Sequence, residues 1–105
     1  MVAIPAAVNQ NNHTFENANK ESMADNNQAL KKAGLKITLP RVKILEILQQ
    51  PDCQHTSAED LYKRLIDQGE EIGLATVYRV LNQFDDAGIV TRHHFEGGKS
   101  VFELA

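Results

Sequence analysis

Hydrophobic residues recur at spacings of three and four between residues 73 and 88, a pattern that predicts an amphipathic helix. Gly73 is an acceptable N-cap, and Gly88 stands where helices commonly end in a left-handed residue. The arc expected to face the core comprises Leu74, Val77, Val80, Leu81, Phe84 and Ala87. The opposite, exposed arc comprises Ala75, Thr76, Arg79, Asn82, Gln83 and Asp86, with Tyr78 at its border.

Two further helices are predicted before this one. The first covers residues 26–33 and ends at Gly34. The second begins at Thr38 as N-cap, with Pro40 in its first turn, and is stopped by Pro51. Because its apolar residues occupy much of its circumference, we expect it at the centre of the core; these are Val42, Ile44, Leu45, Ile47 and Leu48.

Another helix is expected to begin at Thr56 or Ser57, because Thr56 with Glu59 and Ser57 with Asp60 both have the spacing of a capping box. Its apolar stripe is Ala58, Leu61, Tyr62, Leu65 and Ile66, and Gly69 closes it. Residues 70–72 then lead into the 73–88 helix, and Ile72 could make a short strand contact there. Two helices joined by a short turn of this kind predict a helix-turn-helix.

After Gly88 the pattern changes to alternation, which predicts a β-hairpin of residues 89–95 and 99–104. Gly97-Gly98 suits a two-residue type I′ turn, a register that sets Glu96 opposite Lys99 and Arg92 opposite Glu103. It also turns one face inward: Thr91, His93, Phe95, Ser100, Phe102 and Leu104. The fold class predicted is mainly α with a small β-hairpin, a winged helix-turn-helix of three to four helices and a two-stranded wing.

The exposed side chains of the 73–88 helix suit the major groove of DNA. Ala75 permits close approach, while Thr76, Tyr78 and Arg79 can reach base edges or phosphates. The other end of the helix carries acidic residues that would repel phosphate, so we expect insertion by the N-terminal end. The pattern of this helix alone is equally compatible with an amphipathic surface helix whose single arginine has no binding role.

The net charge of −3 argues mildly against nucleic-acid binding, but the charges are unevenly distributed. Residues 31–45 hold five basic residues and no acidic one: Lys31, Lys32, Lys36, Arg41 and Lys43. The tip of the predicted wing adds Lys99, within reach of a phosphate backbone. A polarised domain can bind DNA on one face despite a negative total charge.

Residues 1–22 are rich in Asn and lack periodicity, which predicts a flexible leader or an added tag, with a single domain at 23–105. No apolar run is long enough for a membrane span, and the first residues make a poor signal peptide. Cys53, the single cysteine, fits a reducing compartment and a cytoplasmic protein, and we expect it in a loop without a special role. We find no nucleophile–base pair, phosphate-binding loop or metal cluster, and therefore expect no enzyme.

Four stretches carry a family resemblance: residues 33–41 (AGLKITLPR), 57–62 (SAEDLY), 75–81 (ATVYRVL), and 88–99 with GIV at the start and FEGGK at the end. They resemble the ferric uptake regulator family, and the likeness covers residues 23–105 almost without a gap. The resemblance implies a bacterial, metal-dependent transcription repressor of iron-uptake genes. Such proteins have a winged-helix domain that binds an AT-rich palindromic operator in double-stranded DNA, and a C-terminal domain for homodimerisation that holds most metal ligands.

The resemblance also implies roles for individual residues. Tyr78 and Arg79 match residues that read the major groove, and Lys36 matches one that enters the minor groove. His55 and Glu103 match two ligands of a regulatory metal site between the domains, although one His and one Glu in such positions would not stand out by chemistry alone. The full-length protein would use ferrous iron as corepressor and also bind zinc.

The Cys-x-x-Cys motifs and dimerisation sheet of full-length relatives do not occur in these 105 residues. We therefore expect this chain to lack the C-terminal domain, to be monomeric or weakly associating, and to bind no metal tightly by itself. A zinc- or peroxide-responsive member of the same family remains an alternative. Another is a winged helix for protein interaction, since Tyr78 and Arg79 are also common interface anchors.

Overall fold

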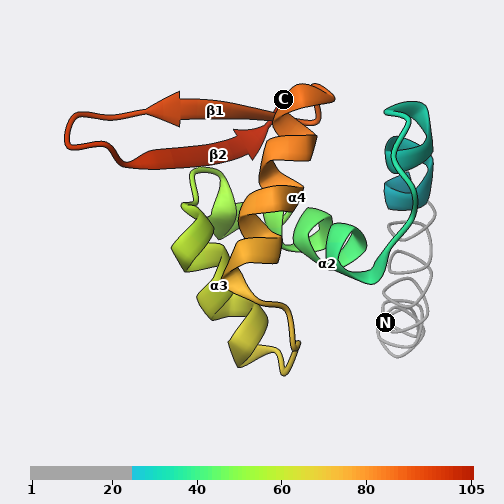
Figure 1. Ribbon diagram of the computed structural model, residues 1–105, viewed down its shortest axis with the longest axis horizontal. Coiled ribbons are helices and arrows are strands. Elements are labelled where there is room, and N and C mark those ends of the chain that lie inside the picture. The colour runs from blue at the N-terminus through green and yellow to red at the C-terminus, as the bar shows by residue number, and fades with distance from the viewer. Residues whose placement is uncertain (1–24) are drawn as a thin grey trace, which may run out of the picture.

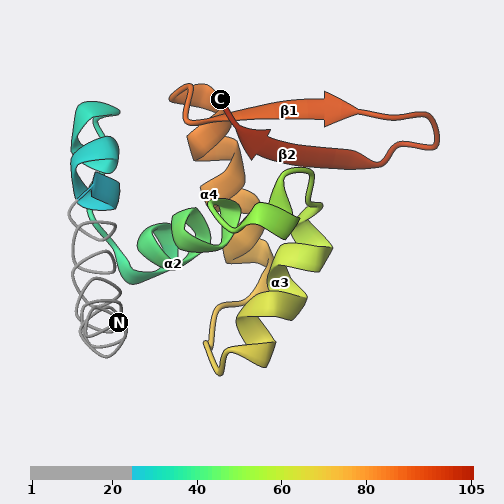
Figure 2. The same ribbon diagram turned by 180° about the vertical axis from the view of Figure 1, so that it is seen from behind.

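The computed structural model describes residues 25–105 of the chain. Figure 1 shows α2 and α3 beside the central helix α4, with a two-stranded antiparallel sheet projecting from the end of α4. Figure 2 shows the same arrangement from behind. The elements are a helical segment at 25–32, α2 (Leu39–Leu48), the 3₁₀ turn η1 (Pro51–Cys53), α3 (Ala58–Asp67), α4 (Leu74–Asp86), β1 (Val90–His94) and β2 (Ser100–Leu104). The predicted winged helix-turn-helix is confirmed.

The starts of α2 and α3 follow from their capping residues. The Thr38 hydroxyl accepts a hydrogen bond from the Arg41 N–H at 3.4 Å, as predicted for α2. For α3, Ser57 is the N-cap and accepts from the Asp60 N–H at 3.2 Å. The neighbouring Thr56 instead forms an isolated β-bridge to Phe102, with backbone hydrogen bonds of 3.1 and 2.8 Å. This bridge ties the start of α3 to the second strand of the wing.

The core lies where the three main helices and the base of the sheet meet. Its largest fully buried side chains include Leu30, Ile44, Ile47, Leu61, Leu65, Val77, Leu81 and Phe84. Burying one such side chain stabilises the fold by roughly 1.5–3 kcal/mol. All five apolar residues predicted for the inner face of α2 are buried, so its central position is confirmed.

Three predictions near the core were wrong. Ile66 is 51% exposed, because it lies about a quarter turn beyond the Leu61–Leu65 stripe that faces the core. Ile72 makes no strand contact and instead packs into the core as a buried side chain. Cys53 lies in a 3₁₀ turn rather than in the loop expected after Pro51, and its burial there raises the pKa of its thiol.

The register of the hairpin differs by one residue from the predicted one. Phe95 donates its N–H to the Lys99 carbonyl at 2.8 Å, and the Gly98 N–H donates to the Phe95 carbonyl at 3.2 Å. The connection is therefore a three-residue loop, in which Gly97 and Gly98 have φ of +88° and +81°. The predicted pairs Glu96–Lys99 and Arg92–Glu103 are wrong, because Arg92 lies opposite Phe102 and Thr91 lies opposite Glu103.

This shift decides which side chains face the core. A slip of one residue moves the side chains of a strand to the other face. Val90 and Phe102 are each 2% exposed, whereas Phe95 is 55% exposed and Thr91 is also exposed, so the prediction that Phe95, Thr91 and His93 face inward was wrong. Exposed cross-strand charge pairs contribute at most about 1 kcal/mol, less than the burial of a valine. Burial of Val90 therefore outweighs the predicted charge pairs.

Within residues 25–105, every helix is too short or too polar to pass through a bilayer. The predicted leader or tag at residues 1–22 lies outside the described residues.

Candidate nucleic-acid interface and metal ligands

The N-terminal half of α4 presents the predicted face to solvent. Ala75 and Arg79 are exposed, Thr76 is half-buried, and Tyr78 is 41% exposed. The N-cap Gly73 supplies no side-chain acceptor, and no acidic residue occupies the first turn. The first backbone N–H groups and the positive end of the helix dipole can therefore meet a phosphate.

Tyr78 is held at the border between α4 and α3. Its hydroxyl donates a hydrogen bond to the Glu59 carboxylate at the start of α3. This bond lowers the pKa of Glu59 and raises the pKa of Tyr78 above their ordinary values, because it favours the carboxylate together with the neutral phenol. The ring is thus fixed in an exposed position and does not belong to the core.

A groove of about 590 Å³ separates the exposed face of α4 from the wing. Its walls are the start of α3, the middle of α4 and the tip of the hairpin, where Lys99 is exposed. Arg92 lines the groove as well, and its guanidinium contacts Asn82 and lies 5.1 Å from the centre of the Phe102 ring. These contacts link β1 to the middle of α4 and so fix the position of the wing relative to that helix.

Lys36 and Arg41 lie beside α4 on the other flank. Lys36 is exposed in the extended link before α2, whereas Arg41 is half-buried. The Arg41 Nε and Nη2 donate to Gln83 Oε1 at 3.2 and 2.9 Å, and Nη1 donates to the Lys36 carbonyl at 2.9 Å. These hydrogen bonds join the link before α2 to α4, whereas Lys99 lies at the tip of the wing, across the groove.

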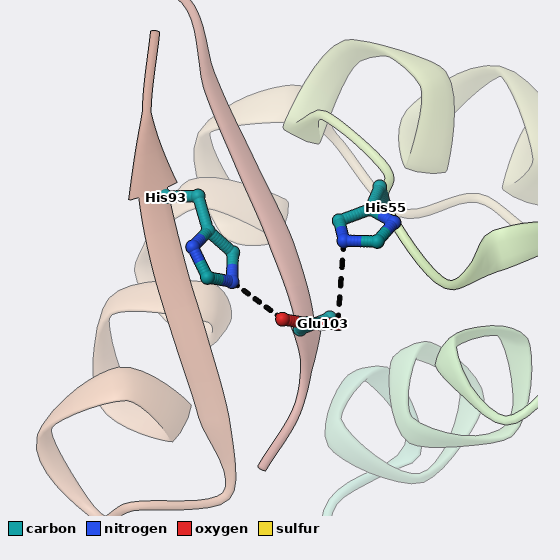
Figure 3. Close-up of side chains that lie close together, drawn as sticks. All are labelled: His55, His93 and Glu103. Atoms are coloured by element: carbon teal, nitrogen blue, oxygen red, sulfur yellow. Dashed lines mark hydrogen bonds and ion pairs between the residues drawn. The ribbon is translucent and has the colours of Figure 1, made fainter.

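The two metal ligands implied by the resemblance meet on the outer face of the wing, together with a third side chain (Figure 3). His93 Nε2 is 2.5 Å from Glu103 Oε1, and His55 Nε2 is 3.4 Å from Glu103 Oε2. Glu103 thus uses one oxygen toward each histidine. All three side chains are partly or fully exposed.

This donor set fits a divalent transition metal. The candidate ligand atoms lie within 4.8 Å of one another. Two ligands that are each about 2.1 Å from one ion lie at most about 4.2 Å apart, so small side-chain rotations bring all three onto one ion. Two imidazoles and a carboxylate are donors suited to iron, zinc or manganese.

His93 was missed in the sequence, where it was expected to face inward. The observed register puts it on the outer face of β1, diagonal to Glu103 on β2. The structure thus brings together three candidate ligands, whereas the resemblance implied two. A register chosen by burying Val90 would have placed His93 beside Glu103 and revealed the cluster.

Comparisons with known proteins agree with the fold. The family model described as the ferric uptake regulator family matches residues 32–105. A ferric uptake regulation protein of Vibrio parahaemolyticus is 89% identical over 83 residues, which cover 79% of this chain and 56% of that protein. The chain thus spans little more than half the length of this curated relative.

Two solved structures are similar as well. The crystal structure of the Vibrio cholerae ferric uptake regulator matches with a TM-score of 0.76 and 88% identity, covering 76% of this chain and 61% of that one. The ferric uptake regulator from Pseudomonas aeruginosa with manganese matches with a TM-score of 0.73 and 62% identity, covering 76% and 60%. The family model covers well over half of the chain, and the fold is shared with these structures. The chain belongs to the ferric uptake regulator family.

Proposed function

We propose that this chain is the DNA-binding domain, residues 23–105, of a metal-responsive bacterial repressor that acts in the cytoplasm on iron-uptake genes. The observation that carries the proposal is the open N-terminal half of α4, where Tyr78 and Arg79 project beside uncapped backbone N–H groups. The similar ferric uptake regulator of V. cholerae has DNA-binding domains, which supports DNA binding by this fold. No catalytic role is proposed for this chain.

The contacts divide between the two grooves and the backbone of the DNA. Arg79 pairs with the edge of a guanine in the major groove, and the Tyr78 ring packs on a thymine methyl group, with Ala75 and Thr76 against the same groove. Lys36 enters the minor groove, which is narrow and electronegative in AT-rich DNA. Lys99 and Arg41 neutralise phosphates. A palindromic operator then matches a homodimer of the full-length protein, because each subunit reads one half-site.

His55, His93 and Glu103 would hold the regulatory divalent ion, for which we propose ferrous iron, with zinc bound elsewhere in the full-length protein. The manganese in the P. aeruginosa structure supports an ion of this class. When bound, the ion supplies positive charge and fixed bonds at the point where the start of α3 meets the wing. Structural sites usually have four protein ligands, and these three donors are partly or fully exposed, so we expect them to bind an ion only weakly until a further ligand completes the shell.

The DNA proposal is tested by fluorescence anisotropy with an AT-rich palindrome and a scrambled duplex of equal composition, at two salt concentrations. We expect tighter binding to the palindrome, and an affinity that falls steeply with salt because counterions are released. Affinity should be modest, since a single module covers roughly 600–1,000 Å². Arg79→Ala should abolish much of the preference. Arg64→Ala removes the same charge from α3, where Arg64 contacts Asp52 and Gln50, and should leave the preference intact.

Equal binding to both duplexes at both salt concentrations would refute sequence-specific recognition. It would favour the second candidate, a winged helix for protein interaction, which the net charge of −3 also suits. Zinc- and peroxide-responsive regulation remain alternatives for the full-length protein.

Metal binding is tested separately from DNA binding. Titration with Mn²⁺ should broaden the NMR signals of His55, His93 and Glu103, and His93→Ala should reduce this broadening. Metal should nevertheless leave the DNA titration of this chain unchanged, because the ion joins groups that already lie together. A tenfold gain in affinity on adding Mn²⁺, lost in His55→Ala, would refute that expectation.

A further inference from the structure

The Arg41 guanidinium joins three parts of the molecule. Its side chain leaves the first turn of α2, donates to the Lys36 carbonyl in the preceding link, and donates twice to Gln83 on α4. Three of the five N–H groups of the guanidinium are therefore used inside the protein. The remaining two can still donate to a phosphate, but the guanidinium is held in place by the protein, unlike the end of a mobile lysine side chain.

We propose that Arg41 is a positioning residue, which fixes the link carrying Lys36 at a set place beside the base-reading face of α4. Gln83 follows Arg79 by four residues and so lies one turn along the same side of the helix. The bonded chain Lys36–Arg41–Gln83 thus ends one turn from the residue proposed to read guanine. This inference rests on the proposed DNA binding and assigns a specificity function to Arg41 and to Gln83.

The link needs such a tether at its middle. Its start is fixed because the Leu35 N–H donates to the Leu30 carbonyl at 2.9 Å and Leu35 packs against the core. Its end is fixed by the Thr38 cap of α2. Between them Lys36 and Ile37 are exposed, so burial does not hold their backbone. The hydrogen bond from Arg41 fixes the backbone of Lys36, and hence the point from which its long side chain reaches into the minor groove.

The role requires an arginine and a neutral acceptor. The planar guanidinium donates in two directions at fixed angles, which the point charge of a lysine ammonium cannot reproduce. Gln83 contributes an oxygen acceptor without a charge. Replacement of Arg41 by Lys therefore keeps the positive charge for any phosphate contact but removes the tether, and Gln83→Met removes the acceptor with no change of charge.

The first measurement is DNA affinity in a double-mutant cycle. We expect Arg41→Lys and Gln83→Met each to weaken palindrome binding by about fivefold, the effect of one ordinary hydrogen bond, with an unchanged salt slope. Lys36→Ala should cost at least threefold less in the Gln83→Met background than in the unmodified chain, because coupled residues are not additive. The matched control Gln68→Met alters an exposed glutamine just after α3 and should bind normally. Normal binding by Gln83→Met, or additive losses, would overturn the proposal.

The second measurement needs no DNA. Backbone order parameters at Lys36 and Ile37 should fall toward about 0.6 in Gln83→Met and stay near about 0.85 in the unmodified chain and in Gln68→Met. Unchanged order parameters in Gln83→Met would overturn the tether even if this variant bound DNA more weakly. Conversely, absence of palindrome preference in the unmodified chain would defeat the proposed function while this test still decides the role of Arg41. Circular dichroism of each variant establishes that it is folded.

Discussion

Arg92 holds the wing against α4, and its removal should loosen the wing measurably. The guanidinium lies 5.1 Å from the centre of the Phe102 ring, contacts the Asn82 side chain, and has its Nε 3.7 Å from the Asp85 carboxylate. A partly exposed cation–π contact contributes about 0.5–1 kcal/mol, and the hydrogen bond about as much again. The pair with Asp85 adds little, because exposed ion pairs contribute about 0–1 kcal/mol. We expect Arg92→Ala to lower the free energy of unfolding by about 1–2 kcal/mol in total.

Urea unfolding followed by circular dichroism measures this loss, and thermal unfolding should show a lower Tm, by about 4–8 °C for each kcal/mol in a domain of this size. Arg92→Met is the matched control: it keeps apolar contact with Phe102 while removing the charge and the donors, so it should lose less. Amide exchange in β1 and β2 should accelerate in Arg92→Ala more than exchange in α2. A change of stability below about 0.3 kcal/mol, with unaltered exchange in the wing, would refute the reasoning.

Three further outcomes are expected. Tyr78→Ala should keep the fold, since the ring is 41% exposed, and lose DNA binding, whereas Tyr78→Phe should keep both; a large fall in Tm for Tyr78→Ala would contradict this. Lys36→Ala should reduce the salt slope of DNA binding by about one, as expected when the protein loses one positive charge that contacts the DNA. The hydrogen bond from the Tyr78 hydroxyl lowers the pKa of Glu59. This hydrogen bond is therefore fully present above the ordinary pKa of a glutamate and is lost as pH falls through the lowered value, because the carboxylate is then protonated. NMR shifts of Tyr78 between about pH 6 and about pH 2 can follow the loss.

The helices were predictable because their signals are local. The spacing of apolar residues in α4, with Gly73 before it and Gly88 after it, depends only on neighbours within a few turns, and α4 runs over Leu74–Asp86 as this pattern indicates. The cap at Thr38 is equally local. Where two local signals competed, at Thr56 and Ser57, the sequence could not choose, because the choice depends on a bridge from Thr56 to the distant Phe102.

The role of Arg41 was not predictable for the same reason. A basic residue in a basic stretch predicts a phosphate contact, and that prediction stays untested. Its hydrogen bonds to Gln83 connect residues 42 positions apart. Spacing and composition carry no information on such a pair until α2 and α4 have been packed together.

The register of the wing shows how one local choice determines the chemistry of a site. Gly97-Gly98 favoured a two-residue turn, and two exposed charge pairs supported it, but each of these terms is small. Side chains alternate along a strand, so a register that buries Val90 must also place His93 on the opposite, outer face. On that face Glu103 is its diagonal neighbour, and the Thr56 bridge to Phe102 brings the adjacent His55 close to the same carboxylate. The burial of an apolar residue therefore assembles the three candidate ligands, and a hairpin register is better chosen from its buried side chains than from its turn.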